Sequence, residues 1–300
     1  MNPNIQNGIA ITGALGNLGW KLLCHLAEHS AAPRLVGLDL RDAEPGRLEQ
    51  LQTISEIHAD PPQIDLITCD LSNWHDQRWR TVINEVSAVV HFAAKNPYPE
   101  ASWNDATVSI DMTNNISQAS ADSPTLSRFV FATSNHVMGR YKDANLKPGE
   151  LHTHLEAGVG TLWYTGQEHM DSTIYAMAKF AGERQCKTVS QKSDTTFVCT
   201  RIGWCQPGKN LPATLSAAGT PTQQSDPDPA LEQTNRWFRD MWLSNRDFLH
   251  LFERALLADA SPWPEKCIVV NGMSNNTNMP WDLSHTHQYL NYTPKDNVYK

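Results

Sequence analysis

The stretch Ile9-Ala10-Ile11-Thr12-Gly13-Ala14-Leu15-Gly16-Asn17-Leu18-Gly19 decides the fold. A short apolar run stops at three closely spaced glycines, and leucines at helical spacing follow as far as His29. A buried strand that ends in such a turn and opens a helix presents free backbone N–H groups at the positive end of the helix. Gly13 would allow the tight turn, Gly16 the close approach of backbone to phosphate, and Gly19 the packing of helix on strand. The stretch therefore predicts a pyrophosphate site, and an ordinary glycine-rich turn is the alternative.

A second apolar run, residues 34–39, ends in the carboxylate of Asp39, about twenty residues after the last glycine. In a dinucleotide-binding fold an acid at this position hydrogen-bonds the adenosine ribose hydroxyls. A carboxylate repels a 2′-phosphate, so NAD is favoured over NADP, although Arg41 lies close enough to weaken that preference. A solvated acid at a strand end is the alternative reading of Asp39.

Two further runs end in residues suited to a cofactor. Residues 64–69 are followed by Asp70 and Leu71, placed for the adenine ring, and residues 88–92 end in Phe92 and lead into Ala93 and Ala94. Small residues at that point let the backbone lie near a cofactor.

Strand and helix patterns alternate to about residue 205, which predicts an α/β, Rossmann-type, doubly wound parallel sheet with helices on both faces. We expect an NAD-binding domain over 1–205 and a small C-terminal substrate-binding lobe over 206–300. Two long irregular segments, 143–172 and 206–233, interrupt the rhythm; loops of this length are functional lids or disordered insertions. An amphipathic helical stretch rich in core aromatics follows over 235–259.

Composition limits the class of protein. Three hundred residues that are 40% hydrophobic can bury a large core, and a net charge of −8 argues against a nucleic-acid surface. The six cysteines form no CxxC pair, which indicates free thiols in a reducing compartment. His152 and His154 resemble a metal pair but have no third ligand nearby, so no metal site is predicted. With no leader-like N-terminus and no apolar stretch of membrane length, we expect a cytoplasmic protein without a membrane partner.

The chemistry is carried by three residues. A fifth apolar run, residues 128–133, leads into Ser134, and Tyr175 and Lys179 follow four residues apart, on one face of a helix. A phenol with a pKa near 10 is a poor base at neutral pH, but an adjacent ammonium stabilises phenolate and lowers that pKa. A serine hydroxyl at the neighbouring strand end can hold the substrate oxygen beside the phenol. Together they predict a proton-transfer device for an alcohol that loses hydride to a nicotinamide.

These motifs resemble the extended short-chain dehydrogenases/reductases of the epimerase/dehydratase branch. The resemblance is strongest to the NAD-dependent uronate dehydrogenases, which oxidise the anomeric carbon of a sugar acid to a lactone. It is carried over nearly the full length by several segments: Thr133 to Gly139, Arg201-Ile202-Gly203, Asn235-Arg236, Trp242-Leu243-Ser244, Asp247-Phe248, Trp281 to Ser284 and Pro294 to Asn297.

The resemblance implies that Tyr175 is the base, Lys179 its activator and ribose ligand, and Ser134 the substrate aligner. The residues implied to contact NAD are Gly13, Leu15, Gly16, Asn17, Leu18, Asp39, Asp70, Leu71, Phe92, Ala93, Ala94, Thr133, Tyr175, Lys179 and Ile202. Those implied to line the sugar site are Lys95, Asn96, Ser134, Asn135, His136, Tyr175, Gly203, Trp204 and Arg236. A homodimer or higher oligomer through helices near 102–121 and 175–190 is expected by the same analogy.

The chain departs from the family pattern at two site positions. Ser109 stands where the family has an Asn that seats a proton-relay water, and Trp237 stands where it has an arginine that grips the substrate carboxylate. Arg236, Arg239 and Arg246 are the candidate replacements for that arginine.

Three functions are compatible with this pattern. The first is an NAD-dependent sugar 1-dehydrogenase, and the second is a sugar epimerase or dehydratase that recycles bound NAD. Nucleotide-sugar enzymes need a larger C-terminal lobe than the residues after 260 supply, which favours the dehydrogenase. The third, a non-catalytic NAD(H)-sensing protein, is disfavoured because Tyr175 and Lys179 are both present.

Overall fold

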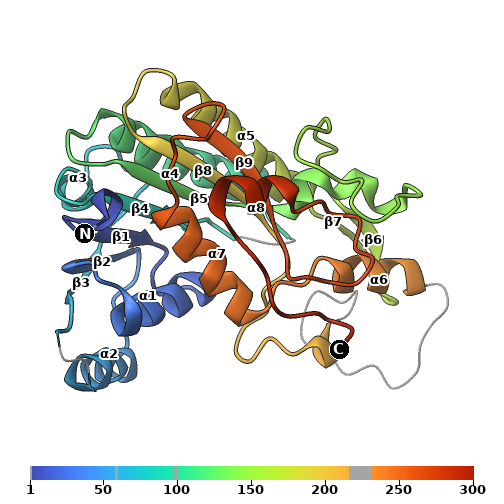
Figure 1. Ribbon diagram of the computed structural model, residues 1–300, viewed down its shortest axis with the longest axis horizontal. Helices are drawn as coiled ribbons and strands as arrows, with labels where there is room; N and C mark the ends of the chain where they lie inside the picture. Colours follow the sequence, from blue (N-terminus) through green and yellow to red (C-terminus); the bar gives the residue numbers. More distant parts are fainter. Residues whose placement is uncertain (1, 58–59, 97–99, 216–230) are drawn as a thin grey trace.

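Seven parallel strands form the central sheet of the computed structural model, which describes residues 2–57, 60–96, 100–215 and 231–300 (Figure 1). Their order is β3-β2-β1-β4-β5-β8-β9. The strands are β1 (Ile9–Thr12), β2 (Arg34–Asp39), β3 (Gln63–Thr68), β4 (Ala88–His91), β5 (Arg128–Ser134), β8 (Thr196–Ile202) and β9 (Cys267–Gly272). All strand pairs in this sheet are parallel. The predicted Rossmann-type doubly wound sheet is confirmed.

Helices cover both faces of the sheet (Figure 1). One face carries α1 (Asn17–His29), α2 (Pro45–Ile57), α7 (Asn245–Leu257) and α8 (Ser284–Leu290). The other face carries α3 (Gln77–Ile83), α4 (Trp103–Asp122) and α5 (Thr173–Ser190). Each layer has its own apolar core, around Leu22 and Phe252 on the first face and around Trp79 and Ile116 on the second. The strands read as continuous apolar runs because both faces are covered.

The first irregular segment contains structure that its sequence pattern did not predict. Within 143–172 lies an antiparallel hairpin, β6 (Leu162–Tyr164) and β7 (His169–Asp171), whose second strand leads directly into α5. Trp163 of this hairpin is buried against Phe238. Three-residue strands are too short for a period of two to stand out in a sequence.

The helical stretch predicted over 235–259 consists of two helices. The first is α6 (Glu232–Asp240), and α7 begins after Ser244, whose hydroxyl accepts the N–H of Asp247. Between them the backbone of Trp242 pairs with that of Trp204. A capping serine and this backbone pairing end one helix and start the next.

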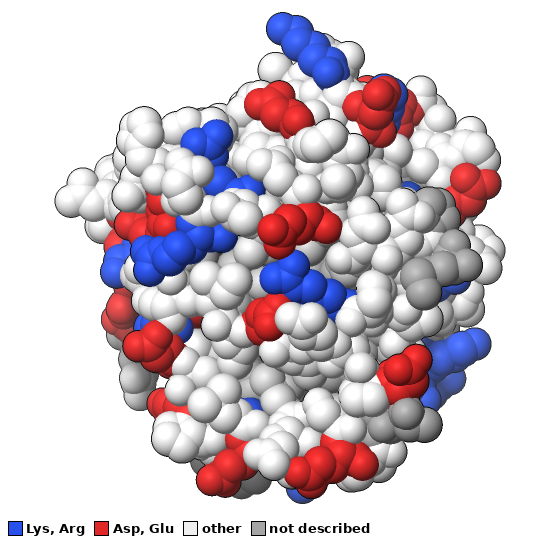
Figure 2. Space-filling view, turned by 90° about the vertical axis from the view of Figure 1, so that its left-hand side faces the viewer, with Lys and Arg blue, Asp and Glu red and all other residues white. Residues whose placement is uncertain are grey.

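Other elements are short: η1 (Pro3–Ile5), η2 (Asn135–Asp143) and η3 (Pro212–Thr214). All six cysteines are free thiols. In the described part of the chain, no helix is long and apolar enough to cross a membrane. Acidic and basic side chains are interspersed on the face shown in Figure 2. The boundary at residue 205 stays a prediction; β9, beyond it, completes the main sheet.

A buried arginine fastens α7 to the sheet. Arg128, 1% exposed, donates from Nη2 to the carbonyl oxygen of Ala258 at 2.7 Å and from Nε to Thr196 Oγ1 at 2.9 Å. It also donates to the carbonyl of Ala255, and its guanidinium lies 4.5 Å from the ring centroid of Trp263. The carbonyls at the end of α7 have no partner within the helix, so this cation caps them.

We expect Arg128→Met to lower the free energy of unfolding by about 2–4 kcal/mol, because it leaves buried carbonyls without donors. Urea unfolding measures the change. Arg184→Met removes an exposed arginine of α5 and is the control, with an expected change below about 0.5 kcal/mol. Equal stability of the two variants would contradict the capping role.

Candidate active site

A cavity of about 940 Å³ opens at the carboxyl ends of the strands. Its lining comes from the segments after β1, β2, β3, β4, β5 and β8. The strand order reverses direction between β1 and β4, and ligands of open α/β sheets bind in the crevice at such a switch point. The topology therefore makes this cavity the candidate ligand site.

The glycine turn after β1 forms one wall of the cavity. Gly13 has φ +64°, and a Cβ on it would lie 2.9 Å from the amide nitrogen of Ala93. A Cβ on Gly19 would lie 2.2 Å from the carbonyl oxygen of Gly13, so α1 packs too closely for a side chain there. Gly16, the N-cap of α1, gives the first turn no side-chain cap. This cradle and its uncapped amides fit a pyrophosphate.

Asp39, at the end of β2, contacts the same glycine turn. Its Oδ2 accepts the amide N–H of Leu15 at 2.9 Å, and its Oδ1 accepts the amide N–H of Arg41 at 3.2 Å. Arg41 and Arg47 donate to the carbonyl oxygen of Leu15 at 3.3 and 2.8 Å. One acid and two cations thus meet where a dinucleotide fold holds the adenosine ribose.

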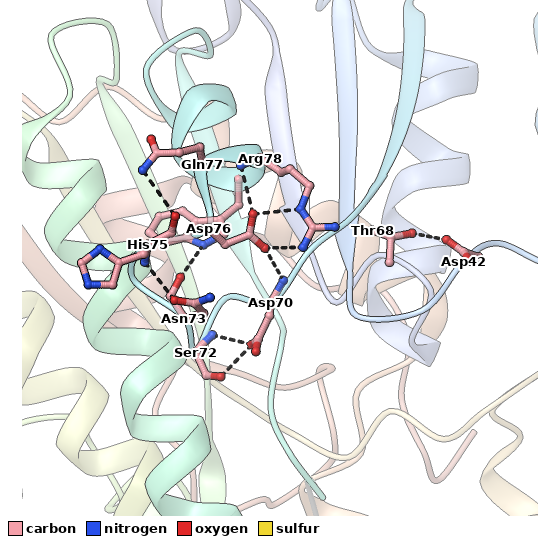
Figure 3. Close-up of polar contacts among 10 residues, drawn as sticks. Asp42, Thr68, Asp70, Ser72, Asn73, His75, Asp76, Gln77 and Arg78 are labelled. Atoms are coloured by element: carbon pink, nitrogen blue, oxygen red, sulfur yellow. Dashed lines mark hydrogen bonds and ion pairs between the residues drawn. The ribbon is translucent and has the colours of Figure 1, made fainter.

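The turn after β3 is held by its own carboxylates (Figure 3). Asp70 Oδ1 accepts the Ser72 amide at 2.9 Å and the Ser72 hydroxyl at 2.6 Å. Asp76 accepts the Asp70 amide at 2.9 Å and pairs with Arg78, whose guanidinium lowers the Asp76 pKa to about 2. The bonds shape the cavity wall formed by Cys69, Asp70 and Ser72.

The three predicted catalytic residues lie together. Ser134 ends β5 and is hydrogen-bonded to the phenol of Tyr175, on the first turn of α5. Lys179, one turn later, is buried; its Nζ donates to the carbonyl oxygen of Ala132 at 2.8 Å and lies 6.0 Å from the Tyr175 ring centroid. Ser134 and Tyr175 line the cavity, and Lys179 stands behind them.

One electrostatic expectation is wrong for this structure. We expected Lys179 to lower the pKa of the Tyr175 phenol, but burial raises that pKa and outweighs the lowering effect of the Ser134 hydrogen bond. Burial also lowers the pKa of Lys179 to about 8. The Lys179 amine donates to the Ala132 carbonyl oxygen and lies 6.0 Å from the Tyr175 ring centroid.

The far end of the cavity is lined by polar and aromatic groups. Asn135 is buried and donates from Nδ2 to Met241 Sδ at 3.2 Å, while its Oδ1 has no hydrogen-bond partner among the described residues. The His136 ring meets the Tyr175 ring edge-on at 6.0 Å, and Trp204 packs on Phe238 at 5.0 Å. A buried carbonyl oxygen without a donor suits a hydroxyl-bearing ligand.

Most predicted site residues line the cavity. They are Gly13, Gly16, Asn17, Leu18, Asp39, Asp70, Leu71, Phe92, Ala93, Ala94, Lys95, Asn96, Ser134, Asn135, His136, Tyr175, Ile202, Gly203 and Trp204. Four predicted residues do not: Leu15, Thr133, Lys179 and Arg236. Leu15 contributes its backbone to the Asp39 contacts, and Thr133 donates to Glu183 at 2.8 Å.

The sequence missed other lining residues, among them Leu40, Cys69, Ser72, Val108, Met112, Cys205, Pro207 and Met241. Ser72 carried a signal, because it follows the strand-end Asp70. Val108, Met112 and Met241 lie in or after helices, where an apolar residue is equally typical of the core.

The three candidate replacements for the family's arginine have other contacts. Arg236 pairs with Asp240 at 3.6 Å, Arg239 lies 5.3 Å from the ring centroid of Tyr299, and Arg246 pairs with Asp296. None of them is among the described residues that line the cavity.

Trp237 is itself buried against Trp281, with ring centroids 4.5 Å apart. Lys95 is the cationic residue of the described lining at the end of the cavity near Tyr175.

Ser109 of α4 ties down the loop that carries Lys95. Its Oγ accepts the Lys95 amide at 2.9 Å and lies 3.3 Å from the Lys95 carbonyl oxygen. A second cavity of about 10 Å³, the size of one water, lies between Ser109, Thr113 and Lys179.

Two histidines of the first irregular segment, His152 and His154, lie close together and do not line this cavity. The His154 ring lies 6.1 Å from that of His152 and 4.5 Å from that of His285. Among the described residues, no group of three His, Cys, Asp or Glu side chains has an arrangement that could hold a metal ion.

Comparison with known proteins identifies the class. The model of the NAD dependent epimerase/dehydratase family matches residues 9–204, and the chain belongs to that family.

Individual relatives cover nearly the whole chain. The NAD-dependent glucose-6-phosphate dehydrogenase of Haloferax volcanii is 28% identical over 96% of this chain and 93% of its own length. The L-arabinose 1-dehydrogenase (NAD(P)(+)) of the same organism is 28% identical over 96% of each chain. A solved structure of a mutated uronate dehydrogenase superposes with a TM-score of 0.66 at 23% identity, over 97% of this chain and 82% of that one. The uronate dehydrogenase of Pseudomonas putida is 25% identical over 97% of this chain and 84% of its own length, so the predicted resemblance to sugar 1-dehydrogenases and uronate dehydrogenases is confirmed.

Proposed function

We propose that this protein is an NAD-dependent sugar dehydrogenase that oxidises the anomeric carbon of a free sugar or sugar acid to a lactone. The observation that carries the proposal is the hydrogen-bonded pair of Ser134 and Tyr175, which lines the same cavity as the glycine cradle. A group that moves a proton therefore shares one crevice with a site that fits a dinucleotide. The names of the sugar-oxidising relatives support the substrate class.

The residues that would hold NAD are the glycine turn for the pyrophosphate, Asp39 for the ribose and Asp70 for the adenine. When bound, NAD supplies the hydride acceptor for the C1 hydrogen. Ser134 donates to or accepts from the anomeric hydroxyl and holds it beside Tyr175. In its phenolate form Tyr175 accepts the hydroxyl proton and becomes neutral phenol; because burial raises the Tyr175 pKa, this form is favoured as the pH rises. Lys179 is buried behind Tyr175, with its Nζ 6.0 Å from the ring centroid, and its ammonium would offset the negative charge of the phenolate.

The contacts of the substrate with this chain follow from the lining. Asn135 Oδ1 accepts from a sugar hydroxyl, which satisfies a buried oxygen that has no partner in the described part of the chain. The indole of Trp204 offers an apolar face for the sugar ring. A sugar with an anionic group binds it through Lys95 rather than through an arginine at the position of Trp237.

An NAD-reduction screen tests the proposal with neutral hexoses and pentoses, uronates, phosphorylated sugars and nucleotide sugars. We expect NADH to accumulate with at least one free sugar or sugar acid and a lactone to form in equal amount. A nucleotide sugar that is converted without net NADH would instead establish the epimerase or dehydratase alternative.

Cofactor choice gives a sharper test of the adenosine end. We expect Asp39→Ala to raise the KM for NAD about tenfold through loss of ribose hydrogen bonds, and to lower the KM for NADP. Arg41 and Arg47 remain to attract a 2′-phosphate once the carboxylate is gone.

The control is Asp42→Ala, which removes a nearby acid that accepts from Thr68 and does not line the cavity. Its two KM values should match those of the unmodified protein. An unchanged NAD-to-NADP preference in Asp39→Ala would refute the ribose assignment.

We also propose that the protein forms a homodimer or higher oligomer in the cytoplasm. The proposed contact between copies is made by α4 and α5. These helices pack side by side and leave the side chains of Trp103 and Met177 exposed, at 60% and 41%. Large apolar side chains exposed on packed helices suit burial by a second copy.

A further inference from the structure

The first irregular segment, residues 143–172 (the first insertion), contacts the candidate active site at His136, which precedes the segment in η2. His136 Nδ1 lies 2.7 Å from Thr161 Oγ1 and 2.9 Å from Ser172 Oγ. These hydroxyls flank the β6–β7 hairpin, and both residues are 0% exposed. Nothing in the sequence pattern connected either residue with the site.

The other bonds of the Ser172 hydroxyl favour donation of its proton to His136 Nδ1. Ser172 Oγ already accepts the amide N–H of Thr161 at 2.9 Å, so its own proton is available to donate. The nearer acceptor for that proton is His136 Nδ1, at 2.9 Å, against 3.4 Å for the Thr161 carbonyl oxygen. The Thr161 hydroxyl lies closer still, at 2.7 Å, so the two hydroxyls share the single lone pair of an unprotonated Nδ1.

The backbone keeps this contact in register. The amide of Gly160 donates to the carbonyl oxygen of His136 at 2.9 Å, and the amide of Ser172 donates to that of Thr161 at 3.0 Å. The amide of His136 donates to Ser134 Oγ at 3.1 Å, so the ring stands beside the Ser134–Tyr175 pair. The position of the imidazole is therefore fixed from both the hairpin side and the catalytic side.

We propose that Thr161 and Ser172 are positioning residues that hold His136 in the tautomer with Nδ1 as acceptor and Nε2–H as donor. This proposal rests on the sugar dehydrogenase function proposed above. Nδ1 lies on the side of the ring that contacts Thr161 and Ser172, so in this tautomer the N–H is at Nε2, away from those two hydroxyls, on a residue that lines the cavity. His136 then donates a hydrogen bond to a substrate oxygen. It does not compete with Tyr175 for the proton of the substrate hydroxyl.

The surroundings of the ring agree with a neutral donor. Trp163 and Phe238 lie against it, with ring centroids at 6.1 and 6.4 Å. Burial lowers the pKa of His136 to about 4, which keeps the imidazole uncharged at neutral pH. A neutral imidazole has one N–H, so fixing Nδ1 as the acceptor places that N–H at Nε2.

Histidine ¹⁵N NMR of the full-length protein tests the tautomer without any substrate. We expect the His136 signals, assigned by their loss in His136→Gln, to show an unprotonated Nδ1 and a protonated Nε2. Thr161→Val keeps the shape but removes one donor, and we expect a mixture of tautomers in it. A protonated Nδ1 in the unmodified protein would overturn the proposal, even if sugar oxidation is confirmed.

Steady-state kinetics test the consequence for the substrate. We expect Thr161→Val to raise the sugar KM about tenfold, the equivalent of about 1.4 kcal/mol, with the Kd for NAD unchanged. Thr161→Ser restores the hydroxyl and should restore the KM. Ser172→Ala is the second variant; the Ser172 side chain makes no capping bond to α5 that the variant could lose.

Thr153→Val is the matched control. Thr153 belongs to the same insertion and its hydroxyl also contacts a histidine, His285 Nδ1 at 3.0 Å, outside the cavity. Its KM should equal that of the unmodified protein. Equal KM values and equal spectra in Thr161→Val and the unmodified protein would refute the positioning role. If no sugar is oxidised, the proposed function fails, while the NMR result still decides the tautomer.

Discussion

Replacing Tyr175 by phenylalanine should reduce kcat for sugar oxidation about 1,000-fold and leave the Kd for NAD within about twofold. The substitution removes one oxygen, which bonds to Ser134 in the cavity, and leaves the ring beside His136 in place. General base catalysis by a positioned side chain is worth about 100- to 10,000-fold. Because the glycine cradle and Asp39 are untouched, binding of the dinucleotide should persist.

Stopped-flow or steady-state NADH formation gives kcat, and calorimetric titration gives the Kd for NAD. Tyr141→Phe is the control, because its hydroxyl donates to the Glu156 carbonyl at 3.0 Å and the residue does not line the cavity. Its kcat should be unchanged. A Tyr175→Phe enzyme that keeps more than about a tenth of the activity would show that another group takes the proton.

Replacing Arg201 by methionine should lower the free energy of unfolding by about 3–5 kcal/mol. Arg201 Nη2 and Nε bind the two carboxylate oxygens of Glu183 at 2.7 and 3.0 Å, and both side chains are almost fully buried. Thr133 donates to the same carboxylate at 2.8 Å. With methionine at position 201, the buried Glu183 carboxylate would keep the Thr133 hydroxyl as the remaining donor of this group of contacts.

This ion pair also aligns the site. Glu183 lies one turn after Lys179 on α5, Arg201 lies on β8, and Thr133 precedes Ser134 on β5. The bonds therefore hold the helix of Tyr175 against the strand of Ser134. We expect the Arg201→Met protein to lose activity along with stability.

Urea unfolding of three variants separates the contributions. Lys187→Met breaks an exposed pair with Glu265 and should change stability by less than about 1 kcal/mol. The double variant Glu183→Met/Arg201→Met removes both charges and should recover part of the loss. Destabilisation by less than about 1 kcal/mol in Arg201→Met would contradict the account of this pair.

The sheet and its cofactor edge could be predicted because their signals are local. Glycines at fixed spacing, a carboxylate at a strand end, and Tyr175 one turn before Lys179 each reflect backbone geometry within a few residues. Such features survive in a single sequence and lead directly to the segments that line the cavity.

The remaining features of the fold and the site could not be predicted, because they depend on contacts between segments that are far apart in the sequence. Thr161 and Ser172 meet His136 only because the hairpin folds back over the end of β5, and nothing in their local sequence marks that contact. Arg236 was a candidate for the site because it lies beside Trp237, yet its guanidinium pairs with Asp240. The break before α7 was hidden because apolar residues continue through it.

The pKa of Tyr175 was mispredicted for a related reason. Spacing on a helix brings an ammonium near a phenol, but its effect depends on where the ammonium points and how deeply both groups are buried. Here the Lys179 amine bonds to the Ala132 carbonyl, and burial of the phenol dominates. The spacing of residues along a helix gives neither the direction of the ammonium nor the depth of burial of the two groups.

The most direct test of the central claim is an oxidation with the best sugar from the screen, carrying deuterium at C1. The account predicts that NADH forms with that deuterium on its nicotinamide ring, that the step shows a primary isotope effect, and that Tyr175→Phe abolishes the transfer. NADH without deuterium, or deuterium transfer that proceeds unchanged in Tyr175→Phe, would contradict it.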